Sequence, residues 1–255
     1  MFIIQEKKIT MNKYCFIVPI YNHHHKLEEL FMALNKYSFS IVLVDDGSHE
    51  ECKQVIANVI SKYKDSYLKT LELNSGKGAA VMAGLQFAYE KGYSHGIQID
   101  ADFQHDVTDI EKFIHLSNEN SGALICGIPS YDESVPKKRL YPRYITHFWV
   151  WVHTLSFAIK DSMCGYRCYP LATTQQLMSN VRLSKRMNFD IEIIVRLSWM
   201  GVNIINQPTK VVYHDEIPSN FRMFKDNLGI TMTHTKLFFG MLIRIPMLIK
   251  RKING

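Results

Sequence analysis

The segment Tyr14–Ile20 reads YCFIVPI, an apolar run that ends at the polar pair Tyr21-Asn22. Such a run, bounded by turn residues, is typical of a strand buried on both faces. Four further runs of this kind follow: Ile41–Val44, Leu68–Leu73, Ile97–Ile99 and Ala123–Cys126. Amphipathic stretches typical of helices separate them, at Lys26–Lys36, Glu50–Lys62, Gly78–Lys91 and Val107–Asn120. This alternation predicts an α/β fold: an αβα sandwich with a mostly parallel central sheet.

The second half of the chain has a different pattern. Ile145–Ile159 is apolar almost all round, which fits either a core helix or a helix at a membrane interface. A helical segment at Phe189–Met200 and a strand-like segment at Val202–Tyr213 follow. Phe221–Ile249 has a helical period and leads into a basic tail, Lys250-Arg251-Lys252. We therefore expect a main domain at residues 1–220 and an amphipathic, basic, membrane-associating segment at residues 221–255.

The composition limits the class of protein. The chain has 255 residues, 47% of them hydrophobic and 21% charged, which is enough apolar material for a sizeable core. Its five cysteines are odd in number and lack close pairs, so a disulfide framework or a thiolate zinc site is disfavoured. The N-terminus has no apolar leader, and either Met1 or Met11 can be the start. We expect a reducing, cytoplasmic location.

The net charge indicates an anionic partner without choosing one. A formal charge of +6 suits nucleic acid, anionic lipid or a phosphorylated substrate equally well. No stretch of 18 or more residues is free of charged side chains, which argues against an integral membrane protein. The choice between partners has to come from motifs.

The sharpest local motif is Asp100-Ala101-Asp102, which follows the predicted strand Ile97–Ile99. Ligands of open parallel sheets sit at the carboxyl ends of the strands, so this loop lies where chemistry is expected. Two carboxylates in one loop suit Mg²⁺ or Mn²⁺, which take oxygen ligands and keep positions open for substrate phosphates. A solvated acidic turn is the alternative interpretation.

Two glycine-containing motifs are also placed after predicted strands. Asp45-Asp46-Gly47-Ser48 fits an Asp-Gly turn in which Ser48 begins a helix, and one of its carboxylates can also bind a nucleobase or ribose. Gly76-Lys77-Gly78 opens a predicted helix, where backbone N–H groups and Lys77 favour an anion. The sequence contains neither a P-loop nor the dinucleotide-binding glycine fingerprint.

Two further motifs combine acids with an arginine or with a helix start. Asp161–Arg167 joins an acid, a glycine and an arginine in a turn, so Arg167 either clamps a phosphate or forms a structural Asp–Arg pair. Asp190 and Glu192 lie near the start of the helix Phe189–Met200, where the helix dipole favours acids even without a function. Both interpretations stay open at this point.

From about Tyr14 to Asn227 the chain resembles the family 2 glycosyltransferases of the GT-A fold, on the strength of six motifs that occur in order. The resemblance is closest to the dolichyl- and polyprenyl-phosphate mannosyl- and glucosyltransferases. The motifs are FIVPIYN (Phe16–Asn22), VDDGS (Val44–Ser48), NSGKGAAVMAG (Asn74–Gly84), DADFQH (Asp100–His105), GYRCY (Gly165–Tyr169) and FDIEI (Phe189–Ile193). One position departs from the family pattern: His23 stands where an acid often follows the Tyr-Asn pair.

The resemblance implies roles for particular residues. Those expected to bind the nucleotide-sugar are Pro19, Tyr21, Asn22, Asp46, Lys77, Asp100, Ala101 and Asp102. Those expected to face Mg²⁺ or Mn²⁺ are Asp100, Asp102 and Gln104. Those expected near the reacting groups are Arg167, Asp190 and Glu192. Those expected to contact phosphate are Arg139, Arg143 and, in the loosely matching loop His214–Asn227, Arg222.

The function that follows from the resemblance is transfer of a hexose from a nucleotide-sugar to a lipid-linked acceptor. The acceptor is expected to be a polyprenyl phosphate or a glycolipid, the enzyme metal-dependent and inverting, and nucleic acid not a partner. We expect a peripheral protein on the cytoplasmic face of an anionic membrane. Two alternatives remain: a nucleotidyltransferase on the same core, and a non-catalytic lipid-binding module with a degenerate transferase fold.

Overall fold

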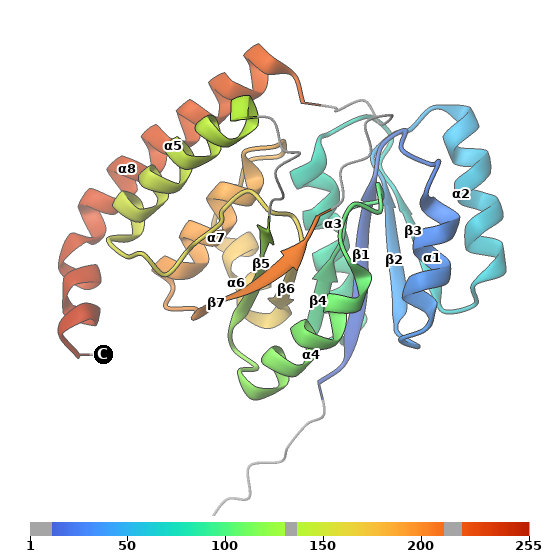
Figure 1. Ribbon diagram of the computed structural model, residues 1–255, viewed down its shortest axis with the longest axis horizontal. Coiled ribbons are helices and arrows are strands. Elements are labelled where there is room, and N and C mark those ends of the chain that lie inside the picture. The colour runs from blue at the N-terminus through green and yellow to red at the C-terminus, as the bar shows by residue number, and fades with distance from the viewer. Residues whose placement is uncertain (1–11, 131–136, 212–220, 255) are drawn as a thin grey trace, which may run out of the picture.

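The computed structural model describes residues 12–130, 137–211 and 221–254 (Figure 1). The strands in these ranges are β1 (Tyr14–Ile20), β2 (Ser40–Asp45), β3 (Ser66–Thr70), β4 (His95–Gln98), β5 (Leu124–Ser130), β6 (Arg167–Pro170) and β7 (Ile204–Lys210). The helices are α1 (Leu27–Asn35), α2 (Glu50–Lys62), α3 (Lys77–Glu90), η1 (Val107–Asp109), α4 (Ile110–Glu119), α5 (Lys137–Thr154), α6 (Leu171–Asn180), α7 (Phe189–Trp199) and α8 (Met223–Asn254).

These strands form one mixed sheet in the order β3-β2-β1-β4-β6-β5-β7. The pairs β3–β2, β2–β1, β1–β4 and β5–β7 are parallel, and only β6 runs antiparallel to its two neighbours. The prediction of a mostly parallel sheet is therefore confirmed. Parallel pairing brings the ends of β1, β2 and β4 to one edge, which is where the candidate site is built.

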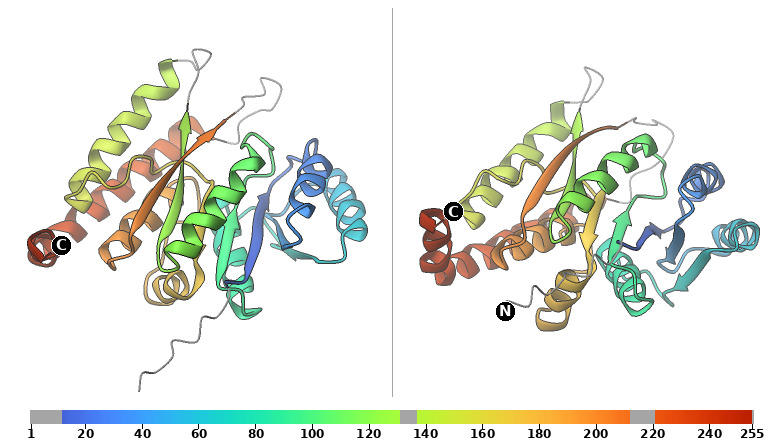
Figure 2. Two further views of the ribbon diagram at one scale, coloured as in Figure 1. Left: turned by 60° about the horizontal axis from the view of Figure 1, so that its bottom comes forward. Right: turned by 90° about the horizontal axis from the view of Figure 1, so that it is seen from below.

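Helices lie on both faces of the sheet (Figure 2), and a hydrophobic cluster fills the space on each face. Alternate residues of β1 point to opposite faces of the sheet. Ile17 packs in the cluster that contains α3, α6 and α7, and Phe16 packs in the cluster that contains α1, α2 and α4. Every residue of β1 is buried, because a central parallel strand with helices on both faces has no solvent side. All five cysteines are free and buried in these clusters.

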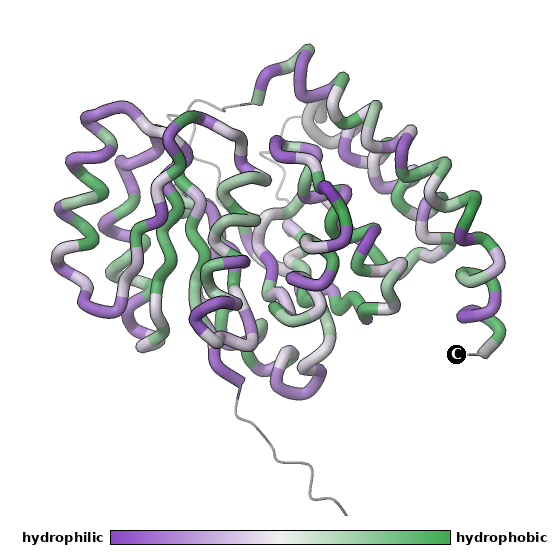
Figure 3. Tube along the Cα trace, turned by 180° about the vertical axis from the view of Figure 1, so that it is seen from behind, coloured by the Kyte–Doolittle hydropathy of each residue, from purple (hydrophilic) through white to green (hydrophobic). Residues whose placement is uncertain are grey.

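The two helices outside the sandwich, α5 and α8, lie side by side in Figures 1 and 2. Leu237 and Met241 of α8 are buried in the larger cluster, and the indole Nε1 of Trp199 on α7 donates to the carbonyl of His153 on α5 at 2.9 Å. Apolar residues recur among polar ones along α8 (Figure 3). Within the described ranges, neither α8 nor any other helix is both long and apolar enough to cross a membrane.

Several expected elements differ from the observed ones. The turn expected at Asp161–Arg167 ends in the buried strand β6, whose first residue is Arg167, and α6 follows; the periodicity predicted neither element. A strand of only four residues is too short for an alternation signal. The expected helix Ile145–Ile159 instead begins at Lys137, continues through Pro142 and ends at Thr154. Val212 and Tyr213, expected in the last strand, lie outside the described residues.

Candidate active site

The loops after β1 and β2 are fastened to each other. Asn22 has a positive φ of 58°, and its backbone N–H donates to Ser48 Oγ at 3.0 Å. Its side-chain Oδ1 accepts from the N–H of His49 at 2.8 Å. Ser48 N–H donates to Asp45 Oδ1 at 2.9 Å and closes the expected turn, but the expectation that Ser48 begins the helix was wrong, because His49 precedes the first residue of α2, Glu50. Asn22 and Asp45 therefore shape this edge of the site.

Asp46 fixes the neighbouring loop. Its carboxylate is buried, and its two oxygens accept the backbone N–H groups of Ser75 at 2.7 Å and Gly76 at 2.8 Å. Gly76 has φ 103°, a conformation that side chains rarely adopt. Burial raises the pKa of Asp46, and the two N–H donors oppose that rise. The carboxylate thus sets where Lys77, the next residue, begins α3.

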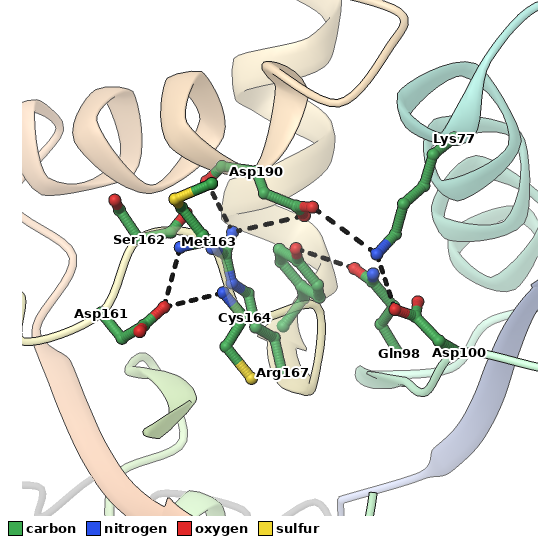
Figure 4. Close-up of polar contacts among 10 residues, drawn as sticks. Lys77, Gln98, Asp100, Asp161, Ser162, Met163, Cys164, Arg167 and Asp190 are labelled. Carbon is green, nitrogen blue, oxygen red and sulfur yellow. Dashed lines mark hydrogen bonds and ion pairs between the residues drawn. The ribbon is translucent and has the colours of Figure 1, made fainter. Parts of the chain in front are cut away.

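Lys77 stands at the centre of the polar cluster drawn in Figure 4. Its Nζ lies 2.7 Å from Asp100 Oδ2 and 3.7 Å from Asp190 Oδ2. Burial by itself would lower the pKa of Lys77, but the attraction of Asp100 and Asp190 outweighs it and raises that pKa. The sequence predicted a phosphate-facing lysine; the structure shows an ammonium already paired with two carboxylates.

The two carboxylates after β4 are in different electrostatic states. Burial raises the pKa of Asp100, but Lys77 outweighs this effect and lowers it. Burial and the charge of Asp100 raise the pKa of Asp102, whose Oδ1 accepts the backbone N–H of Gln104 at 3.1 Å. Asp100 Oδ1 is buried and has no hydrogen-bond partner among the described residues. Negative charge is therefore in excess here.

This donor set fits a hard divalent cation that is shared with a substrate. No group of three or more His, Cys, Asp or Glu residues converges within the described ranges, so a cage built by protein alone is absent from them. Mg²⁺ commonly binds through one or two carboxylates plus substrate phosphates, and Asp100 and Asp102 supply those carboxylates. The unpartnered Asp100 Oδ1 is a free ligand oxygen of the right chemistry.

The absence of a side chain at Gly165 leaves room for these charged groups. A Cβ at this position would lie 2.7 Å from Lys77 Nζ, 2.9 Å from Gln98 Nε2 and 3.1 Å from Asp100 Oδ1. Contacts this short force the polar groups apart. The backbone of the GYRCY motif therefore forms one wall of the charged cluster, by which we mean Lys77, Asp100 and Asp190. Any side chain at Gly165 would displace Lys77 from Asp100.

Arg167 is wholly buried, at 0% exposure, on the first residue of β6. Its guanidinium donates to the carbonyls of Asp190 and Ser162, both at 2.8 Å, and one nitrogen lies 3.9 Å from Asp190 Oδ1. No face of the guanidinium is open to a substrate. We interpret Arg167 as a group that positions Asp190 and the loop around Ser162, in place of the phosphate clamp expected from the sequence.

The two acids of α7 lie in different surroundings. Asp190 points toward Lys77 in Figure 4, and burial raises its pKa while Lys77 opposes that rise. Glu192 instead accepts from the N–H and Oγ of Ser184, at 2.8 and 2.6 Å, and from Nε of Arg196 at 2.8 Å. The structure therefore brings Asp190 into the cluster and gives Glu192 a bracing role elsewhere on the helix.

A second charged group joins α5 to the loop before β6. Arg143 Nε donates to Asp161 Oδ2 at 2.6 Å, and Asp161 Oδ1 accepts the N–H groups of Met163 and Cys164 at 2.8 Å. Burial opposes ionisation of Asp161, but His147 and Arg143 outweigh it and lower its pKa to about 2. The Asp–Arg pair considered for Arg167 thus exists, with Arg143 as the partner.

The other predicted residues occupy varied places. Pro19 is buried in β1 opposite Val44, and Tyr21 is half-buried just beyond the strand. Arg222 is exposed, and its N–H donates to Asp226 Oδ2 at 2.6 Å. The side chain of Arg139 and the segment 212–220 lie outside the described residues.

Sequence reasoning missed one buried polar pair. Gln98 of β4 accepts from the hydroxyl of Tyr169 on β6 at 3.1 Å, directly behind the charged cluster. A glutamine between two isoleucines in a buried strand was the available signal, because buried polar side chains require partners. Ser184 carried no such signal, since its contact with Glu192 depends on a loop conformation that the motif does not encode.

Solved structures share this architecture. A glucosyl-3-phosphoglycerate synthase from Mycobacterium tuberculosis, solved with Mn²⁺, UDP-glucose and phosphoglyceric acid, superposes with a TM-score of 0.66 at 10% identity, covering 89% of this chain and 80% of that one. The mannosyltransferase PcManGT from Pyrobaculum calidifontis, solved with GDP-mannose and Mn²⁺, gives 0.56 at 12% identity, with 82% and 59% covered. These likenesses establish the class of fold, GT-A, as expected.

Sequence comparison then gives the family. The family model described as glycosyl transferase family 2 matches residues 15–179, and the chain belongs to that family. A dolichyl-phosphate beta-glucosyltransferase of Dictyostelium discoideum is 28% identical over 209 residues, 74% of this chain and 63% of that protein. The human dolichyl-phosphate beta-glucosyltransferase is 25% identical over 201 residues, 70% of this chain and 60% of the human one. The chain thus spans less than two thirds of both.

Proposed function

We propose that this glycosyltransferase moves a hexose, with inversion, from a nucleotide-sugar to a polyprenyl phosphate at the cytoplasmic face of a membrane. The names of the dolichyl-phosphate relatives support a lipid phosphate as acceptor. The UDP-glucose and GDP-mannose of the solved neighbours support a nucleotide-sugar donor. Membership of the family favours glycosyl transfer over nucleotidyl transfer.

An apolar groove between α5 and α8 carries the lipid part of the proposal. It has a volume of about 970 Å³ and is lined on α5 by Ile145 and Trp149, and on α8 by Ile230, His234 and Phe238. The spacing of three or four residues means that each helix turns one face to the groove. An isoprenoid chain is an occupant of matching chemistry, because it buries apolar surface without needing hydrogen-bond partners.

One loop joins the groove to the charged cluster (Figure 4). Met163, one of its lining residues, belongs to the loop that Asp161 holds through the N–H groups of Met163 and Cys164. The carbonyl of Ser162 in that same loop accepts from Arg167, which positions Asp190. A lipid lying in the groove can therefore present its head group near Asp190, with Arg143 of α5 as the nearby phosphate-binding candidate.

On the donor side, Asp100 and Asp102 would hold Mg²⁺ or Mn²⁺, which when bound neutralises the diphosphate leaving group. Asp46 shapes the loop that carries Lys77, and Asn22 fastens the loop after β1 to the turn after β2. Both contacts are made entirely between groups of the protein. The nucleotide pocket we propose is thus preorganised by backbone-directed hydrogen bonds.

On the acceptor side, no strong base is required. A lipid phosphate is already anionic near pH 7, whereas a hydroxyl needs a general base, typically worth 10²–10⁴-fold in rate. Asp190, the acid that reaches the cluster, is paired with Lys77 and bound through its backbone by Arg167. We assign Asp190 a positioning role toward a phosphate acceptor.

The outer surfaces of α5 and α8 support attachment to the membrane. Phe224, Ile243 and Phe148 are exposed by 82%, 80% and 55%, and Lys250 and Lys252 are exposed at the end of α8. Apolar side chains beside lysines are the composition of a helix lying on anionic lipid. On α8, Phe239 and Leu242 are also exposed, while Phe238 and Ile245 pack against the core.

Nucleoside-diphosphate release tests the proposal directly. The purified protein is incubated with a panel of UDP- and GDP-hexoses and Mn²⁺, with polyprenyl phosphate, with the corresponding free polyprenol, or without acceptor. Release that depends on polyprenyl phosphate is the expected result. Release only with the alcohol would move the acceptor to a hydroxyl, and binding of lipid without any release would favour the non-catalytic module.

A further inference from the structure

Lys77 is held between carboxylates that belong to different sides of the site. Asp100, at the end of β4, lies on the side proposed for the donor, and Asp190, on α7, lies on the side proposed for the acceptor. Dashed lines in Figure 4 join Lys77 to both, at 2.7 and 3.7 Å. The exposed fractions of the three side chains are 20%, 24% and 6%, so water screens these charges only in part.

The ammonium has few alternatives to these two partners. The backbone of Gly165 closes one side so tightly that even a methyl group there would lie 2.7 Å from Nζ. Lys77 is also the first residue of α3, and its backbone is fixed through the turn that Asp46 holds. Within this enclosure the side chain can move its charge between Asp100 and Asp190 by a small change of position.

Asp100 cannot bind the Lys77 ammonium and a divalent cation at the same time without loss of free energy. The two cations would repel each other across a partly enclosed carboxylate, where Coulomb interactions are stronger than in water. Arg167 does not neutralise Asp100, because its guanidinium donates to the carbonyls of Asp190 and Ser162. The positive charge that neutralises Asp100 in this structure therefore comes from Lys77.

We propose that Lys77 is the counter-ion of Asp100 until the donor binds. The divalent cation then replaces the Lys77 ammonium at Asp100, and the ammonium stays paired with Asp190. The inference rests on the metal-dependent transfer proposed above. It makes the metal and the nucleotide bind synergistically: Lys77 weakens binding of the free cation, and the diphosphate brings the extra negative charge that favours the exchange. Asp190 acts in this scheme by giving Lys77 a second partner.

Binding of Mn²⁺ alone, measured by electron paramagnetic resonance of the free ion, tests the exchange. Lys77→Gln should bind Mn²⁺ about tenfold more tightly than the wild type, because the competing cation is gone. Asp190→Asn should bind it more weakly, since Lys77 loses its second partner and remains on Asp100. Lys112→Gln is the matched control: Lys112 makes a similar 2.8 Å contact with Asp109, at the surface, and its removal should change nothing.

Addition of UDP or GDP separates the inference from its premise. In the wild type the nucleotide should tighten Mn²⁺ binding strongly, and in Lys77→Gln this gain should shrink. Unchanged or weaker Mn²⁺ binding in Lys77→Gln, or tighter binding in Asp190→Asn, overturns the counter-ion role while leaving metal dependence intact. A wild type that binds no Mn²⁺ even with nucleotide overturns both. Circular dichroism melts confirm folding, and the opposite signs of the two variants exclude a common loss of structure.

Discussion

At the scale of single residues, neighbouring acids in one loop have different tasks. Asp100 is paired with Lys77, whereas Asp102 makes no salt bridge with any of the residues the structure describes. Burial and the charge of Asp100 together raise the pKa of Asp102, which means that ionised Asp102 is destabilised unless a cation lies beside it. A carboxylate with a raised pKa and no cationic partner among the described residues is a strong candidate for a functional role.

Asp102→Asn should therefore lower turnover by about 100-fold or more, since one of the two proposed metal ligands is lost. Its melting temperature should stay unchanged or rise slightly, because the substitution relieves repulsion. Nucleoside-diphosphate release and a thermal melt measure the two quantities, with the exposed Asp65→Asn as control. Full activity of Asp102→Asn, or of the wild type in excess chelator, would remove the metal from the mechanism.

Glu192→Gln should show the reverse pattern. The carboxylate bridges Ser184 and Arg196, so the variant should lose about 1 kcal/mol of unfolding free energy with little change in turnover per folded molecule.

Asp190→Asn at saturating metal should also retain most of its turnover, because a phosphate acceptor needs no base. A loss of 10²-fold or more in Asp190→Asn under those conditions would point to a hydroxyl acceptor.

At the scale of elements, the pair Arg143–Asp161 ties α5 to the loop before β6. The folded-state pKa of Asp161, about 2, is below the ordinary 3.8, so the contacts of its carboxylate with His147, Arg143 and the N–H of Met163 together stabilise the fold above that ordinary value. The stabilisation, about 2 kcal/mol, is lost as the pH falls from about 4 toward 2. Asp161 is buried, so solvent screening reduces this effect little.

Arg143→Met should therefore lower the unfolding free energy at pH 7 by about 2 kcal/mol and flatten its dependence on pH between 4 and 2. Urea denaturation across that pH range measures both. Lys26→Met, which removes an exposed pair with Glu29, should cost no more than about 1 kcal/mol. An equal cost for both variants would mean that α5 is held by its apolar contacts alone.

The groove between α5 and α8 gives a second test at this scale. Thr231→Trp places a large ring on an exposed lining residue and should reduce kcat/KM for polyprenyl phosphate about tenfold, or ~1.4 kcal/mol. Slow donor hydrolysis without acceptor should be unaffected. Met232→Trp, one residue along and outside the groove lining, is the control. Equal kinetics in the two variants would place the lipid chain elsewhere.

The sequence predicted those elements whose periodicity is long or whose boundaries carry turn residues. β1 and α2 have the predicted bounds, since each is a clear run between turn residues. The four-residue β6 was missed, and with it the burial of Arg167, because motif chemistry alone does not show which side of a backbone is covered. The exchange of partners, Asp161 with Arg143 rather than Arg167, depends on tertiary packing that no local pattern records.

At the scale of the whole molecule, many of the exposed large apolar side chains lie on α5 and α8, and α8 ends with exposed basic residues. In Figure 1, α5 and α8 lie at the opposite side from α1 and α2. Arg251, at the end of α8, donates to the carbonyl of Ser198 at 3.1 Å, so Lys250 and Lys252 are the better probes of surface binding. In the membrane attachment that we propose, the side with α5 and α8 would be the face that meets an anionic bilayer.

The wild type should pellet with anionic vesicles, loosen in part at high salt and be released fully by detergent. Lys250→Gln with Lys252→Gln should weaken binding about tenfold at low salt, since each lysine near the surface contributes ~1 kcal/mol that salt screens. At high salt the double variant should match the wild type. Lys36→Gln with Lys64→Gln, on the far side, is the control. Wild type that stays in the supernatant at low salt would contradict membrane attachment.

The place of β6 in the sheet has a consequence for how the chain is made. β4 and β5 follow each other along the chain, yet both bond to β6, which is synthesised later. A ribosome that has released only the first 130 residues therefore holds a half-sheet whose β4 edge is unpaired, a template open to wrong strands. Emergence of residues 167–170 closes that edge and brings Arg167 into place. The charged cluster and the sheet are complete only when Asp190 and then β7 have also emerged, so protease protection of stalled chains should begin to rise once β6 has left the exit tunnel and increase further once β7 has followed.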